Sequence, residues 1–162
     1  MESLIAPWRI NYILRPKEAG AKESVFTRIA QSSDDEGNYV IYRGKTCYSV
    51  LNSFPYNGGH ILICPYREVP DFAALTDEEM LELMHQTRRC IDALKQTMKP
   101  QGFNVGVNLG QVAGAGIVEH LHIHIVPRWN GDTNFMPVVA GTGVLPEALL
   151  DVAARLRAVL NP

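Results

Sequence analysis

The sequence predicts an α+β fold, in which an antiparallel sheet of about five strands carries a long helix on one face and a second helix at the C-terminal end. Three observations predict it. Five short apolar runs are bounded by turn-forming residues, residues 75–100 follow helical spacing, and residues 145–160 do so again. Because 162 residues is the length of one ordinary domain, we predict that residues 1–162 form a single domain.

The first three strands are predicted between residues 39 and 65. An irregular opening, which ends in the polar stretch 31–38, precedes the apolar run "YVIYRGKTCYSVLN". Two short strands around the turn 43–45 fit this run. A loop then leads to "HILICP", a third strand that stops at Pro65 because proline cannot continue a sheet ladder.

The long helix is predicted from a capping signal and a periodic stripe. Thr76 and Glu79 have the spacing of a capping box, and Pro100 follows the helical run. Apolar and small residues recur at steps of three and four, and we expect this stripe to face the core: Met80, Met84, Thr87, Ile91, Leu94 and Met98.

The last two strands and the terminal helix complete the predicted fold. "GFNVGVNLG" and "EHLHIHIVP" have strand-like composition and are joined by "QVAGAGIV", so we expect an antiparallel hairpin. The segment "LPEALLDVAARLRAVL" predicts a C-terminal helix with Pro146 near its first turn.

The composition excludes several classes of protein. With 15 basic and 17 acidic residues the net charge is −2, which argues against a nucleic-acid partner. The odd number of cysteines, Cys47, Cys64 and Cys90, indicates buried thiols in a reducing compartment. The sequence shows neither a signal peptide nor an apolar run of membrane-spanning length, so we expect a soluble, cytoplasmic protein without a membrane partner.

Three of the five histidines lie at alternate positions in "EHLHIHIVPRW". On a strand, His120, His122 and His124 would share one face, while the intervening apolar residues would pack on the other. A chance cluster on a solvent-facing strand is improbable at this spacing. Imidazoles at i and i+2 can chelate a divalent metal, but such sites usually add a carboxylate. An imidazole can also attack phosphorus and form a covalent phosphoramidate, which needs no metal.

The motif and its surroundings resemble a known family. "HLHIHIV" matches the His-φ-His-φ-His-φ-φ signature, where φ is hydrophobic, of the histidine triad (HIT) superfamily. "LNSFPYNGGHILICPYREV", "FNVGVNLG", "PRWNGDTNF" and the opening "APWRINYI" are similar to its bacterial diadenosine polyphosphate hydrolases and phosphorylases. The resemblance implies a HIT-like fold over nearly the whole chain and a two-fold homodimer.

The resemblance also implies a role for each histidine of the motif. His122 corresponds to the nucleophile that attacks the α-phosphate and becomes nucleotidylated. His120 and His124 would position it and contact phosphate oxygens. His60, which precedes the third strand, would complete the polar cluster.

Four further positions are implied or proposed as substrate contacts. Asn52 matches a ribose-binding asparagine, and Asn108 matches an amide that contacts the phosphate or the leaving group, although in an unrelated fold both would be ordinary turn or strand-end residues. Leu51, together with Pro7 and Trp8, is a candidate for the apolar wall of the base pocket. Relatives often carry Gln, Ser or Thr at the position of Gly116, so here a backbone amide or a neighbour must contact the phosphate, or activity is altered.

The chain departs from its relatives at a structural metal site. Many relatives hold zinc with an N-terminal Cys-x-x-Cys and a histidine after "PYR". Here the first region is "GAKESVF" and the residue after Arg67 is Glu68, so we predict no structural zinc. The triad chemistry requires no cofactor, although Mg²⁺ can accompany a polyphosphate substrate.

The resulting hypothesis is a nucleotidyl hydrolase or transferase that cleaves dinucleoside polyphosphates, such as diadenosine tetraphosphate, at the α-phosphate. Water or phosphate would resolve the nucleotidyl-histidine, and the sequence does not distinguish the two. Three alternatives stay open: a nucleotide-binding or regulatory protein with little turnover, favoured by Gly116; a nucleoside phosphoramidase; and a metal-binding protein that uses the histidine row.

Overall fold

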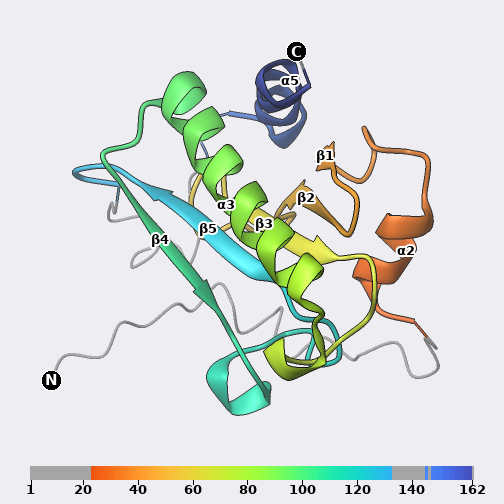
Figure 1. The fold of residues 1–162 in the computed structure, drawn as a ribbon. Coiled ribbons are helices and arrows are strands. Elements are labelled where there is room, and N and C mark those ends of the chain that lie inside the picture. Colours follow the sequence, from red (N-terminus) through yellow and green to blue (C-terminus); the bar gives the residue numbers. More distant parts are fainter. Residues whose placement is uncertain (1–22, 133–144, 146, 162) are drawn as a thin grey trace, which may run out of the picture.

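A computed structural model describes residues 23–132, 145 and 147–161. Its centre is a single antiparallel sheet of five strands in the order β1-β2-β3-β5-β4 (Figure 1). The strands are β1 (Val40–Arg43), β2 (Cys47–Leu51), β3 (Ile61–Pro65), β4 (Gly102–Val107) and β5 (Ile123–Arg128). The predicted α+β fold and the β4–β5 hairpin are confirmed, whereas the extent of the domain stays a prediction.

The two faces of the sheet bury different sets of residues because side chains alternate along each strand. One face, with Ile61, Ile63, Ile123 and Ile125, belongs to the main hydrophobic core. Helices α3 (Asp77–Met98) and α5 (Leu149–Leu160) pack on this face and contribute further residues to the same core (Figure 1). Strand side chains that alternate with these core residues therefore lie on the opposite face of the sheet.

Helix α3 begins with the predicted capping box, in which Thr76 and Glu79 each bind the other's backbone N–H. The predicted core stripe is wrong at its N-terminal end, since Met80 and Met84 are 40% and 57% exposed. Leu83 and two polar residues take the buried positions: Glu79 forms a salt bridge with Arg67, and Gln86 accepts from Ser49. Hydrogen bonding lets these polar side chains replace methionine on the buried face.

Helix α2 (Val25–Gln31) lies in the stretch that was expected to be irregular. Ser24 caps its first turn by accepting from the backbone N–H of Thr27. Phe26 packs with Tyr48, Val50 and other residues in a second apolar cluster, on the face of the sheet opposite α3. The helix is only seven residues long, so packing rather than propensity stabilises it.

The remaining expectations concern the C-terminal helix and the cysteines. Helix α5 is confirmed but begins at Leu149, and Pro146 lies outside the described residues. Cys47, Cys64 and Cys90 are buried free thiols, as predicted, and burial raises the pKa of each. Among the described residues, no helix has the combination of length and apolar character that a bilayer crossing requires.

Candidate functional site

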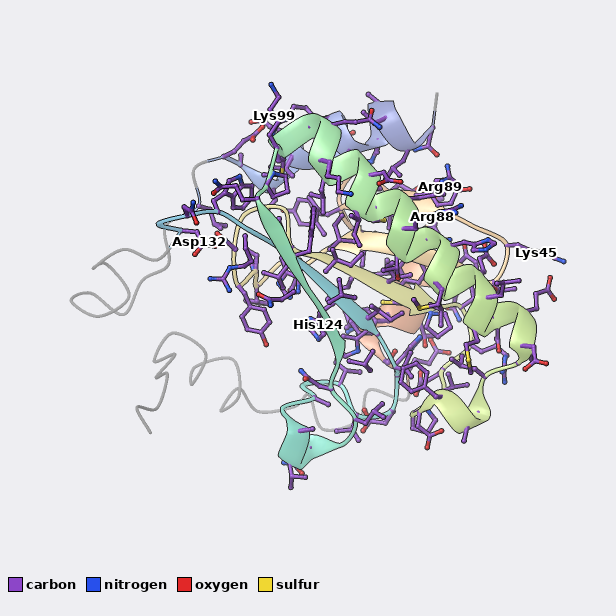
Figure 2. The ribbon with its side chains drawn as sticks, turned by 60° about the vertical axis from the view of Figure 1, so that its left-hand side comes forward. Lys45, Arg88, Arg89, Lys99, His124 and Asp132 are labelled. Atoms are coloured by element: carbon purple, nitrogen blue, oxygen red, sulfur yellow. The ribbon has the colours of Figure 1, made fainter. Side chains whose placement is uncertain are left out.

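The three histidines lie where the chain enters β5, but only His124 belongs to the strand. The strand begins at Ile123, so His120 and His122 occupy the irregular segment before it. The alternation nevertheless holds, because Leu121, Ile123 and Ile125 enter the core, as predicted. Figure 2 shows His124 on β5, whereas Arg88 and Arg89 lie on α3.

His122 is held in one tautomer by the backbone. Its Nδ1 lies 2.8 Å from the carbonyl oxygen of His120, which can only accept, so Nδ1 carries the proton. The lone pair is therefore on Nε2, the nitrogen of this ring that can act as a nucleophile. The side chain is buried, and burial lowers its pKa below the ordinary histidine value, which keeps the ring neutral near pH 7.

His120 is fully buried between two partners. Its Nε2 lies 2.8 Å from the Pro65 carbonyl oxygen and must donate, while Nδ1 lies 2.7 Å from the hydroxyl of Ser24. Since Nε2 holds the proton, Nδ1 accepts from Ser24. Burial lowers the pKa of His120 as well, so this ring is also a neutral imidazole.

His60 and His124 form the other half of the cluster. The backbone N–H of Tyr56 donates to His60 Nδ1 over 3.1 Å, so the proton of His60 is on Nε2. Nε2 lies 3.0 Å from His124 Nδ1 and donates to it. This bond leaves the proton of His124 on Nε2. The structure thus brings His60 to the three histidines of the motif, as the resemblance implied.

Ring packing joins the two halves. The centroids of His122 and His124 are 4.9 Å apart, and those of His60 and His124 are 5.2 Å apart. Tyr56 stacks on His60, and the ring centroid of Phe26 of α2 lies 4.9 Å from that of His122. Neither aromatic residue was predicted from the sequence as part of the site.

Asn52 lies beside this cluster. Its side-chain nitrogen is 3.3 Å from His60 Nδ1, and its oxygen accepts from the backbone N–H of Phe54. Asn52 therefore shapes the loop that positions His60. Its predicted contact with a ribose stays a prediction.

A hollow of about 330 Å³ opens beside His124, on the face of the sheet away from α3. It is lined by Tyr56, Asn104, Val105, Gly106, Val107, Asn108, His124, Val126 and Arg128. Asn108, a predicted substrate contact, shares this hollow with His124. At the rim, Arg128 forms a bidentate pair with Asp132 and donates to Asn104, which fixes the guanidinium in place.

The other predicted contacts lie elsewhere. Leu51 is 1% exposed and belongs to the core cluster shared with α3, so it is not among the residues that line the hollow. Gly116 is exposed in the loop between β4 and β5. Pro7 and Trp8 lie outside the described residues.

The region where the resemblance would lead us to expect zinc ligands, around the start of α2 and Glu68, holds a hydrogen-bonded cluster. Thr27 donates to Glu68 over 2.8 Å, and the backbone N–H of Ser24 donates to the same carboxylate oxygen. These bonds lower the pKa of Glu68. Within residues 23–132, 145 and 147–161, no three His, Cys, Asp or Glu side chains are grouped to hold a metal. In the sequence, this cluster was indicated only by the missing Cys-x-x-Cys and by Glu68 in place of histidine.

Several known proteins are similar to this chain in sequence. The chain is 45% identical over 157 residues to a Mycobacterium tuberculosis protein named AP-4-A phosphorylase, covering 93% of this chain and 80% of that protein. It is 33% identical over 96 residues to the Schizosaccharomyces pombe asymmetrical bis(5'-nucleosyl)-tetraphosphatase, covering 59% of this chain and 52% of the relative.

Solved structures share the fold. A zinc-bound histidine triad family protein from Mycobacterium smegmatis superposes with a TM-score of 0.69 at 26% identity, over 87% of this chain and 95% of that one. The HIT domain family model matches residues 35–131, which include the histidine cluster and all five strands. The chain belongs to the HIT domain family.

Proposed function

We propose that this protein is a nucleotidyl hydrolase or transferase that cleaves dinucleoside polyphosphates at the α-phosphate through a covalent intermediate on His122. One observation carries the proposal: the backbone carbonyl of His120 holds the proton of His122 on Nδ1, which leaves Nε2 unprotonated. The named activities of the M. tuberculosis and S. pombe relatives support the substrate class.

In the first step, His122 Nε2 attacks the α-phosphorus and the bond to the leaving polyphosphate oxygen breaks. The leaving nucleoside polyphosphate is a stable anion and needs no proton. The ring becomes a nucleotidyl-imidazolium, and its Nδ1–H still donates to the His120 carbonyl, which stabilises the developing positive charge. We propose that the other histidines of the cluster and Asn108 position the ring and the phosphate oxygens. Asn52 and Gly116 would contribute to the nucleoside and phosphate sites, whereas Leu51, which is buried in the main core, is no longer proposed as part of the base pocket.

In the second step, an acceptor oxygen attacks the same phosphorus and the P–N bond breaks. The ring leaves as a neutral imidazole with its Nδ1 proton in place, so the leaving group needs no further proton. Water yields AMP and releases a proton to solvent, whereas inorganic phosphate yields ADP. The identity to the M. tuberculosis relative extends over most of both chains, which favours phosphate as the acceptor.

Product analysis distinguishes the two acceptors. Purified protein is incubated with diadenosine tetraphosphate and Mg²⁺, with and without inorganic phosphate, and nucleotides are separated by ion-exchange chromatography. We expect ADP and ATP only when phosphate is present. AMP and ATP without phosphate would identify a hydrolase. Tight AMP binding without turnover of either kind would contradict the proposal and support the nucleotide-binding alternative.

We further propose a homodimer without structural zinc. The hydrogen-bonded positions Ser24, Thr27 and Glu68 support the absence of zinc, because Ser and Thr hydroxyls are poor zinc ligands. The edge strand β4 pairs only with β5 among the described residues, which leaves its other edge for a second copy. Native mass spectrometry tests both proposals. We expect twice the chain mass and no added zinc. A monomer would contradict the dimer, and one zinc per chain would contradict the absence of zinc.

We also propose that the protein resides in the cytoplasm. The support is chemical: all three cysteines are free thiols, which persist in a reducing compartment. Fractionation of the source cells followed by immunoblotting would detect it with cytoplasmic markers, and recovery in the membrane or secreted fraction would contradict the assignment.

A further inference from the structure

We propose that Ser24, at the start of helix α2, is a positioning residue for the nucleophile, acting through His120. This inference rests on the proposed role of His122. The residues of the motif do not include Ser24, which lies 96 positions before His120 in the sequence. Its hydroxyl nevertheless makes a direct hydrogen bond of 2.7 Å to the ring of His120.

The Ser24 hydroxyl keeps Nδ1 of His120, the nitrogen that faces it, unprotonated. The Pro65 carbonyl requires a proton on Nε2, so Nδ1 must accept. Ser24 supplies that donor. With both nitrogens satisfied, the fully buried ring of His120 has one tautomer and one orientation.

The ring orientation is passed to the nucleophile through the backbone of the same residue. The carbonyl of His120 accepts the Nδ1 proton of His122, so the position of His120 sets where Nε2 of His122 points. Phe26, two residues after Ser24, packs against both rings, with centroids 5.5 Å from His120 and 4.9 Å from His122. The start of α2 therefore contacts both histidines at once.

Helix α2 is itself held firmly enough for this role. Its carbonyls accept from two long-range donors: Tyr48 donates to Phe26, and Arg43 donates to Ala30. Glu68 binds both the backbone N–H of Ser24 and the hydroxyl of Thr27. These bonds tie α2 to β1, to β2 and to the segment just after β3, and His120 is bonded to Pro65 at the end of β3.

Ser24 also caps α2, so a test must separate the cap from the bond to His120. Ser24→Gly keeps most of the cap, because glycine is tolerated at the N-cap of a helix nearly as well as serine. It removes the hydroxyl that donates to His120. Ser24→Thr retains both functions and is the conservative rescue. Thr76→Gly, at the cap of α3, removes a capping hydroxyl from a helix that does not contact the histidine motif through its cap.

The experiment measures single-turnover formation of the nucleotidyl-enzyme from diadenosine tetraphosphate by rapid quench, together with KM. We expect Ser24→Gly to slow this step about tenfold, the equivalent of one lost hydrogen bond, with KM unchanged. Ser24→Thr should restore the rate to within about twofold of the wild type, and Thr76→Gly should leave it unchanged. A wild-type rate in Ser24→Gly, or an equal loss in Thr76→Gly, would overturn the proposal.

A second readout does not depend on turnover. Long-range ¹H–¹⁵N spectra of the histidine rings report which nitrogen carries the proton in the free protein. We expect the wild type to show protonated Nε2 in His120 and protonated Nδ1 in His122, and Ser24→Gly to perturb both rings. Unchanged ring signals of His120 and His122 in Ser24→Gly would overturn the positioning role, even if His122 proved not to be the nucleophile. Conversely, the wild type could form no nucleotidyl-enzyme while Ser24→Gly still perturbed the signals of both rings. That result would contradict the proposed function and leave the positioning role of Ser24 intact.

Discussion

His122→Ala is expected to lower the rate of diadenosine tetraphosphate cleavage by about 10³-fold or more, because removing a covalent nucleophile removes the reaction path itself. The fold should survive, since within the part of the chain that the structure describes His122 donates a single hydrogen bond, to a carbonyl of its own segment. Mass spectrometry of wild-type protein denatured at alkaline pH, where the P–N bond is stable, should show one added nucleotidyl group, which is absent from the variant.

The matched control is His85→Ala, which removes an exposed histidine on helix α3. We expect this variant to retain wild-type turnover and to carry the nucleotidyl group. Circular dichroism of both variants verifies that the fold is intact. If His122→Ala turned over at the wild-type rate, the covalent mechanism would have to be abandoned.

Leu94→Ala is expected to destabilise the protein by about 2–5 kcal/mol, the range for a buried leucine whose removal leaves a cavity. Leu94 is fully buried on α3 within the main core. It also reaches the loop before β3: a Cβ built on Gly59 would lie 3.1 Å from its Cδ2. Because Gly59 precedes His60, loosening this contact should also weaken the support of the histidine cluster.

The effect is measured by urea unfolding at fixed protein concentration, as a shift of the midpoint at constant slope. Leu81→Ala on the same helix is the matched control, since Leu81 is 59% exposed and its truncation should change stability by less than about 0.5 kcal/mol. Equal destabilisation by the two substitutions would mean that α3 does not pack against the sheet through the face described above.

Local patterns in the sequence were sufficient for most of the fold. The capping box at Thr76 and the stop at Pro65 each depend on neighbouring residues, and the structure has both. The turn predicted at residues 43–45 lies one residue later, at residues 44–46, because Arg43 still belongs to β1. The helical stripe was shifted at its start because Glu79 and Gln86 are polar, and only their partners elsewhere in the fold make them suitable for burial. Helix α2 was missed for the related reason that seven residues carry little periodic signal.

The sequence by itself determined the family: the alternation of three histidines, with apolar residues between them, matches its signature, and the role proposed for His122 follows from that resemblance. The tertiary structure decided the state of each imidazole. A tautomer depends on which group faces each ring nitrogen, and these groups come from distant positions: Ser24 and Pro65 for His120, and Tyr56 for His60. No periodic pattern records such contacts, because they arise only when α2, the loop before β3 and the approach to β5 pack together.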